Sequence, residues 1–200
     1  MLSLTLLHKR MDLNDPKNLL VIGRTSIISE GLLEIAIGEA ERGNRVLYLA
    51  SKAVDKLPEI FVDRDRSVLK RIIFTYFKSY EALAQKLMDL HNMFLTPNLL
   101  IIESLNSFFT NCSRTNTDSY LEGHAKILAV LHSTVNSFNE RSNANCWSIV
   151  SFDDHEDFSQ QCLTTLIDLF YFKKNCIRAA DEEFIQWFED FKLKCENRQN

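Results

Sequence analysis

Short apolar runs alternate with longer segments of helical periodicity along most of this chain. The runs are four to seven residues long and rich in Leu, Ile, Val and aromatic residues, which is typical of strands buried on both faces of a sheet. They lie at residues 19–22, 46–50, 71–77, 99–103 and 146–152. Because amphipathic segments separate them, the pattern predicts an α/β fold with a mostly parallel central sheet.

Three helices are expected between these strands. Apolar residues recur at helical spacing from Ile28 to Ala40, and Gly43 ends that segment. A second helix is predicted over residues 80–91, and a third, long one over residues 118–140. The first strand, helix and second strand together predict a right-handed βαβ unit.

The two ends of the chain have weaker patterns. Residues 164–172 are compatible with a strand or a helix. In residues 183–191 the spacing of the aromatic residues favours a helix, whereas their density favours a strand. We expect a flexible N-terminal segment over residues 1–17 and a single α/β domain over residues 18–200, with undetermined secondary structure in residues 160–200.

The composition supports one globular core and limits the chemistry. Of 200 residues, 46% are hydrophobic, 25% are charged and only 5 are glycine. Glycine builds the loops that hold phosphate groups and the tight turns of many active sites, so its scarcity argues against both. The net charge is −4, with +2 in residues 1–100 and −6 in residues 101–200, so neither half is a polybasic surface for nucleic acid.

Cysteine content and hydropathy indicate a reducing compartment. The five cysteines are widely spaced and form no C-x-x-C pair, which argues against a zinc knuckle or a disulfide framework. No apolar segment reaches the 18 residues that a membrane span needs, and the N-terminus lacks the order of a secretory signal. We therefore expect a protein of the cytosol or nucleus that binds no metal and no membrane.

The turn after the first strand is the usual phosphate site of an open α/β sheet. Aligned with the pattern G-x-x-x-x-G-K-S/T, this segment keeps only the first glycine, Gly23. Ile28, Ser29 and Glu30 occupy the positions of the second glycine, the lysine and the hydroxyl residue. Ile28 disfavours positive φ, Ser29 brings no positive charge, and Glu30 repels phosphate. The segment predicts a degenerate Walker A loop that binds no nucleotide.

A second candidate is the fourth apolar run. Leu99, Leu100, Ile101 and Ile102 are followed by Glu103, which resembles a Walker B strand whose terminal carboxylate acts on Mg²⁺. A core strand that ends in an acid gives the same pattern. Without the lysine and the hydroxyl of an intact first loop, the carboxylate has no metal to hold.

Other signs of catalysis are sparse. His124 and His132 are two helical turns apart, which is too far for one metal ion. The acidic run 153–157 is typical of a solvated loop, and no G-x-S-x-G nucleophile motif is present. We expect no enzymatic activity and no cofactor.

Candidate contacts to DNA lie between the second and third strands. Residues 52–71 have a net charge of +2, which a mixed solvated surface explains equally well. The basic residues proposed here as DNA contacts are Arg64, Arg66, Lys70 and Arg71.

The order of these segments resembles a known family. NLLVIG, RVLYLASKAVDKLPEIF, LKRIIFTYFKSYEALAQKLMDLH and LLIIESLNSFF follow one another as in divergent RecA-type recombinase paralogues. The resemblance is to the small Shu-complex protein that accompanies a SWIM-domain protein, and to nematode-type partners of recombinase paralogues that show a comparable loss of the Walker A residues. It covers residues 18–152.

The resemblance implies a RecA-like P-loop core domain without catalysis. Such a protein would form a heterodimer with a SWIM-domain protein or another recombinase paralogue. The pair would load or remodel recombinase filaments on single-stranded DNA during homologous-recombination repair in the nucleus. By analogy, the Leu99–Glu103 strand serves the partner interface or is a core strand. Two alternatives stay open: a nucleotide-binding ATPase with an atypical phosphate loop, and a DNA-independent protein-interaction scaffold.

Overall fold

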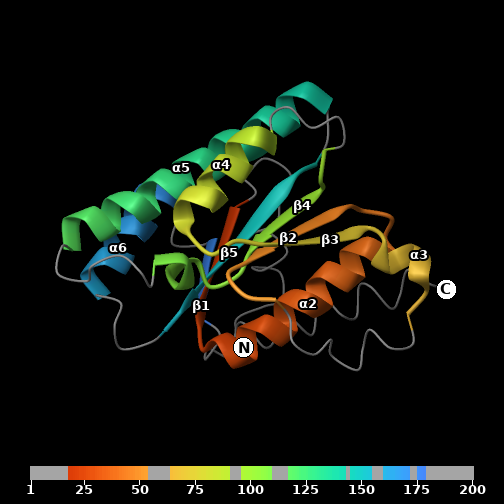
Figure 1. The fold of residues 1–200 in the computed structure, drawn as a ribbon, viewed down its shortest axis with the longest axis horizontal. Coiled ribbons are helices and arrows are strands. Elements are labelled where there is room, and N and C mark those ends of the chain that lie inside the picture. Colours follow the sequence, from red (N-terminus) through yellow and green to blue (C-terminus); the bar gives the residue numbers. More distant parts are fainter. Residues whose placement is uncertain are drawn as a thin grey trace, which may run out of the picture.

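The computed structural model contains a six-stranded sheet in which every described pairing is parallel (Figure 1). The structure describes residues 18–53, 64–90, 96–109, 117–142, 145–154, 160–171 and 175–178. The strands are β1 (Asn18–Gly23), β2 (Val46–Ala50), β3 (Ile72–Tyr76), β4 (Leu99–Ile102), β5 (Trp147–Asp153) and β6 (Cys176–Arg178). Their order across the sheet is β3-β2-β4-β5-β1-β6. The five predicted strands are confirmed, each within one residue at either end, and β6 is an addition.

Helices connect most of the strands. They are α2 (Thr25–Glu41), α3 (Arg66–Leu69), α4 (Tyr80–Asp89), the 3₁₀ helix η3 (Leu105–Phe109), α5 (Thr117–Ser142) and α6 (Gln160–Phe170). Within the segment 164–172, whose sequence is compatible with a strand or a helix, residues 164–170 are helical as part of α6. Residues 1–17 and 183–191 lie outside the described residues, so the expectations for them stay predictions. Over the described part of the chain, no helix has the length and apolar character of a membrane span.

Alternate residues of each strand face two separate cores. On β1, Leu20 and Ile22 belong to the core beneath α4, α5 and α6, whereas Val21 belongs to the core beneath α2. Figure 1 shows α2 and α3 on one side of the sheet and α4, α5 and α6 on the other. Coverage of both faces explains why the strands are continuously apolar in the sequence.

A group of stacked rings holds η3 against α5. Phe109 stacks on His124 with 3.8 Å between ring centroids and on Tyr80 with 4.7 Å. The His124 Nδ1–H donates to the Tyr120 carbonyl oxygen at 2.8 Å. Burial lowers the pKa of His124 to about 4, although this hydrogen bond acts in the opposite direction. The ring is therefore neutral at pH 7, and it anchors the helix that follows the end of β4.

Candidate functional site

The candidate site lies where β1, β4 and β5 end, at the carboxyl edge of the sheet. Parallel register brings these ends together, because Gly23 of β1 pairs with Asp153 of β5 and Ile102 of β4 pairs with Val150. The backbone ladder continues past β4, where the Glu103 N–H donates to the Leu49 carbonyl oxygen at 2.9 Å. This edge is where open α/β sheets bind ligands.

The connection from β1 to α2 is one residue long. The strand ends at Gly23, Arg24 has extended geometry, and the helix begins at Thr25. A phosphate-binding loop needs several consecutive backbone N–H groups that converge on one point outside a helix. A single linking residue does not supply such a loop.

The structure therefore places the Walker-aligned residues on a helix. Ile28, Ser29 and Glu30 lie in the first two turns of α2, and not in the loop that the alignment expected. Ile28 is 1% exposed and packs into the core beneath α2, Ser29 is half-buried, and Glu30 is exposed. The helix begins directly after Arg24 because burial of the Ile28 side chain against the sheet contributes favourable free energy. The same side chain in an exposed loop would not contribute it.

Residues of α2 form hydrogen bonds at the ends of β4 and β5. The Thr25 backbone N–H donates to Asp153 Oδ1 at 3.4 Å, and the Thr25 and Ser104 hydroxyl oxygens are 3.1 Å apart. One helical turn further on, the Ser29 hydroxyl donates to the Glu103 carboxylate. A carboxylate of the chain thus lies at the positive end of the α2 dipole, where a phosphate would otherwise be stabilised.

A second layer of hydrogen bonds supports these contacts. Asn106 Nδ2 donates to the Asp153 carbonyl oxygen at 3.1 Å, and the Asp153 N–H donates to Asn106 Oδ1 at 3.0 Å. Ser104 has a φ of 48°, an unusual value for a residue other than glycine, and its N–H donates to the Ser151 hydroxyl at 2.8 Å. The Ser107 hydroxyl donates to the Ser51 hydroxyl at 2.6 Å. The tight turn after β4 is therefore held by β5 and by Ser51, the residue that follows β2.

The charges at this edge are mainly negative. Glu103 and Asp153 are both half-buried, while Arg24, the one basic residue of the segment 18–41, is exposed. Burial raises the pKa of the Tyr48 phenol well above its usual value, and the Glu103 carboxylate raises it further. No group of three or more His, Cys, Asp or Glu side chains within the described ranges is arranged to hold a metal ion. Two half-buried carboxylates at this edge disfavour a bound polyphosphate.

We name Thr25, Ser29, Glu103, Ser104, Asn106 and Asp153 the carboxyl-edge cluster. Ser29 and Glu103 match Walker-type patterns in the sequence, whereas Asp153 lies in an acidic run typical of a solvated loop. Thr25, Ser104 and Asn106 match no sequence motif. The available signal was their position directly after apolar runs, since the ends of parallel strands meet at one edge.

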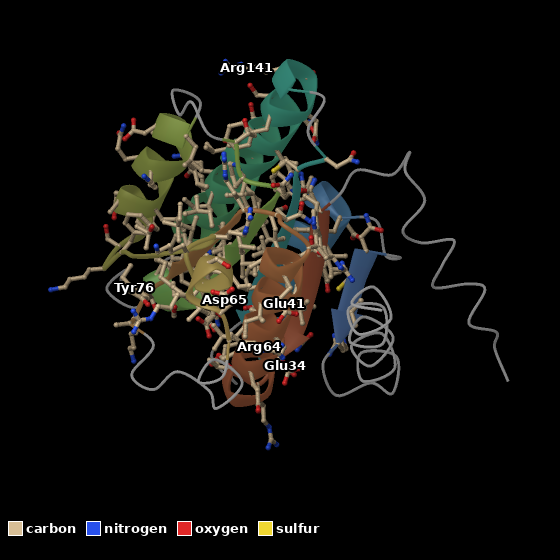
Figure 2. The ribbon with its side chains drawn as sticks, turned by 90° about the vertical axis from the view of Figure 1, so that its right-hand side faces the viewer. Glu34, Glu41, Arg64, Asp65, Tyr76 and Arg141 are labelled. Atoms are coloured by element: carbon tan, nitrogen blue, oxygen red, sulfur yellow. The ribbon has the colours of Figure 1, made fainter. Side chains whose placement is uncertain are left out.

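The candidate DNA contacts lie at the opposite edge of the sheet, near the starts of β2 and β3. Arg64 forms an ion pair with Glu41 at 2.6 Å, and Figure 2 shows the two side chains close together. Arg71 Nη1 donates to the Gly43 carbonyl oxygen at 2.8 Å, whereas Arg66 and Lys70 are exposed. The four residues do not join the carboxyl-edge cluster, and two of them have partners within the chain.

The suggestion that the fourth strand forms a partner interface needs correction. Leu99, Leu100, Ile101 and Ile102 are fully buried, and β4 lies between β2 and β5. A side chain without accessible surface cannot contact another protein, so these residues form a core strand. Glu103 alone reaches the surface at the end of this run.

Comparison with known proteins identifies the fold. No protein-family model and no curated protein sequence matches the chain. Among solved structures, it is similar to the flagellar accessory protein FlaH from Methanocaldococcus jannaschii, a RecA-like archaeal protein, with a TM-score of 0.53 and 12% identity. The match covers 86% of this chain and 75% of that one. Together with the all-parallel sheet, this likeness shows that the chain has a RecA-like α/β fold.

Proposed function

We propose that this protein is a noncatalytic recombinase paralogue of the Shu-complex kind. It forms a heterodimer with a SWIM-domain protein or another recombinase paralogue, and the pair promotes or remodels recombinase filaments on single-stranded DNA in the nucleus. The RecA-like fold supports membership of the wider RecA and ATPase group. The narrower assignment to homologous recombination is supported by the order of segments from NLLVIG to LLIIESLNSFF.

The carboxyl-edge cluster is the observation that carries the noncatalytic part of this proposal. The Ser29 hydroxyl donates to the Glu103 carboxylate, and the Thr25 backbone N–H at the start of α2 donates to the Asp153 carboxylate. Nucleotide binding would require these contacts to break and two half-buried carboxylates to face phosphate. A subunit that acts through its partners needs no such site.

Nucleotide binding tests the noncatalytic role directly. We expect no saturable binding of a fluorescent ATP analogue with Mg²⁺ up to millimolar protein. The variant Glu103→Ala removes the carboxylate at the end of β4, and Glu30→Ala, which removes an exposed carboxylate of α2, is its control. Saturable binding that Glu103→Ala abolishes and Glu30→Ala preserves would refute the noncatalytic role in favour of the atypical ATPase.

Recovery of partners tests the recombination role. The tagged chain is purified from its own cells after treatment with a DNA-alkylating agent, with and without nuclease digestion. We expect a SWIM-domain protein or a recombinase paralogue to co-purify in both conditions, and loss of the protein to increase sensitivity to the agent. Recovery of neither partner, together with normal resistance, would favour the DNA-independent scaffold while leaving the RecA-like fold unaffected.

A further inference from the structure

The short helix α3 carries a serine with basic residues on both sides. Ser67 lies in this helix, and its side chain is exposed. Arg64 and Arg66 precede it by three residues and by one residue, and Lys70 follows it by three. The segment 64–71 contains four basic residues and one acid, Asp65. Among the serines that the structure describes, no other has an arginine three residues before it.

The backbone around Ser67 is held by few contacts. The helix α3 is four residues long, and none of its residues is buried. Val68 and Leu69 are only partly buried, against the core beneath α2. The Ser67 N–H donates to Asp65 Oδ1 at 2.9 Å, which caps the helix. A segment with so little buried surface opens at a small cost in free energy, so it can enter the active site of another enzyme in extended form.

One ion pair ties the start of this segment to the end of α2. Arg64 Nη1 lies 2.6 Å from Glu41 Oε1, and Figure 2 shows the two side chains together. The Arg64 side chain is 36% exposed. Ion pairs that are open to water are weak, so Arg64 can leave Glu41 for a carboxylate of another protein. Arg64 is therefore a recognition contact whose release is limited by Glu41.

We propose that Ser67 is a phosphorylation site for a protein kinase that selects its substrates by an arginine three residues before the serine. Carboxylates of such a kinase would take Arg64 in place of Glu41. In the reaction, the bond from the γ-phosphorus of ATP to its bridging oxygen breaks and ADP leaves. A bond from that phosphorus to Ser67 Oγ forms, and the hydroxyl proton passes to a carboxylate of the kinase. The site goes beyond the proposed function, because the argument uses only the surface of this chain.

Phosphate at Ser67 would change the charge of this surface. Phosphoserine carries a charge of about −1.5 to −2 at pH 7, so the net charge of the segment 64–71 would fall from +3 to about +1. Residues three apart on a helix are neighbours, so the phosphate would lie beside Lys70, whose side chain is exposed. The modification therefore replaces a positive surface at α3 with an ion pair inside the chain.

Labelling with radioactive ATP tests the site on the full-length purified chain. The probe is a purified serine kinase of this arginine-selective class, with its own peptide substrate as the positive control. We expect label at Ser67, located by mass spectrometry, and a loss of about tenfold or more in Ser67→Ala. Ser133→Ala, which removes an exposed serine that has a valine three residues before it, should keep the full label. An unlabelled chain beside a labelled peptide, or label that Ser67→Ala retains, overturns the proposal.

Substitutions of Arg64 and its partner separate recognition from simple exposure. Arg64→Gln should lower the labelling rate about tenfold or more, since charge pairing provides the selectivity. Arg45→Gln removes an exposed arginine outside the segment and should leave the rate unchanged. Glu41→Gln keeps Arg64 but weakens its ion pair, so the rate should rise about twofold to fivefold. Equal rates for Arg64→Gln and Arg45→Gln, or no rise in Glu41→Gln, overturn the proposal.

The chain isolated from its own cells shows whether the site is used there. Phosphatase inhibitors are present during purification, and mass spectrometry measures the occupancy of Ser67. We expect phosphate at Ser67 in the unmodified chain and in Arg45→Gln, and its loss in Arg64→Gln. Absence of phosphate from Ser67 in all three overturns the proposal. It leaves the proposed function untouched, because none of these measurements involves a recombinase.

Discussion

The carboxyl edge and the β3 edge of the same sheet satisfy their polar groups in opposite ways. At the carboxyl edge, hydrogen bonds between side chains and backbone groups join Thr25 of α2, Asp153 of β5 and Asn106 of η3. At the β3 edge, backbone groups face outward beside the half-exposed Ile73 and Tyr76. At the carboxyl edge, where RecA-like and other α/β folds bind ligands, Thr25, Ser29, Glu103 and Asp153 are bonded within the chain. At the lateral edge, no described strand pairs with the outer side of β3.

This difference shows that a fold does not by itself determine where a protein binds its ligands or partners. An α/β sheet provides a potential ligand site at its carboxyl edge whether or not the chain uses it. Here the α2 N-terminus faces a carboxylate of its own chain, so the dipole is satisfied without a ligand. By contrast, β3 has exposed apolar side chains, and no described strand pairs with its outer side.

The largest effect is expected from restoring Walker-type residues on α2. In Ile28→Gly/Ser29→Lys, the loss of a buried side chain and a glycine within the helix should lower the free energy of unfolding by about 5 kcal/mol. Nucleotide turnover should stay absent, because the helix still begins directly after Arg24 and Glu30 is retained. Urea denaturation measures the loss of stability, and a phosphate-release assay measures nucleotide turnover.

The single variants serve as controls for this experiment. Ile28→Gly should account for nearly all of the destabilisation, since Ser29 is only half-buried and a lysine there can face Glu103. ATP hydrolysis by the double variant above the level of Ile28→Gly would show that the carboxyl edge is closer to a nucleotide site than its hydrogen bonds indicate.

Acid should loosen the carboxyl edge through His124, which stacks on Phe109 of η3. Burial lowers the pKa of His124 in the fold to about 4, against about 6.5 in the unfolded chain, so the fold favours the neutral ring. This preference for the neutral ring contributes to the free energy of unfolding above pH 6.5, and the contribution is lost as the pH falls toward 4. It amounts to about 3 kcal/mol for this one residue.

The variant His124→Phe keeps the stacked ring and removes the proton-binding group. Urea midpoints at pH 7, 6, 5 and 4 should therefore fall less steeply for the variant than for the unmodified chain. Burial also lowers the pKa of His132, which supplies part of the remaining slope. Identical slopes for the two proteins would exclude His124 as the group that couples acid to this edge.

Two asparagines offer a matched pair at the two ends of β5. Asn106 exchanges two hydrogen bonds with Asp153 at the carboxyl end, and Asn139 exchanges two with Cys146 just before the strand begins. Each alanine substitution should cost about 2 kcal/mol, because two buried backbone groups lose their partners. Only Asn106→Ala should accelerate amide hydrogen exchange at Thr25 and Ser104. Equal acceleration in Asn139→Ala would show that the cluster has no local stability of its own.

The smallest effect is expected at the β3 edge. Ile72 is buried beneath α2, whereas its neighbour Ile73 is 48% exposed. Ile72→Thr should lower the free energy of unfolding by about 2 kcal/mol, and Ile73→Thr by about 0.5 kcal/mol or less. Thermal unfolding of the two variants compares one substitution on opposite faces of one strand. A large loss in Ile73→Thr would show that this edge is part of the core.

The periodicity of the sequence predicted the strands well because both faces of the sheet are covered. Residues 46–50 and 99–103 form central strands as their continuous apolar character indicates. Residues 71–77 have the same character, yet β3 is an edge strand, since periodicity reports burial and not position across the sheet. The three-residue β6 was missed because it is too short to carry a pattern.

The candidate site was predicted only where it matched a known motif. Ser29 and Glu103 were selected from Walker-type patterns, and the structure joins them by a hydrogen bond. Asp153 was assigned to a solvated acidic run, because nothing nearby in the sequence shows that β5 pairs with β1. Thr25 and Asn106 are common residue types whose partners are remote in sequence.

The sequence by itself determined the alternation of strands and helices, the burial of both sheet faces and the mismatch of residues 28–30 with the Walker pattern. These features depend on local composition and on the spacing of residues, both of which are visible in the sequence. Only the tertiary structure decided which strand ends meet, which strand lies at the edge, and why a helix tolerates Gly123, where an added Cβ would lie 2.5 Å from the Phe109 ring. Such contacts depend on strand order and register, and these are set by packing between segments that are distant in the chain.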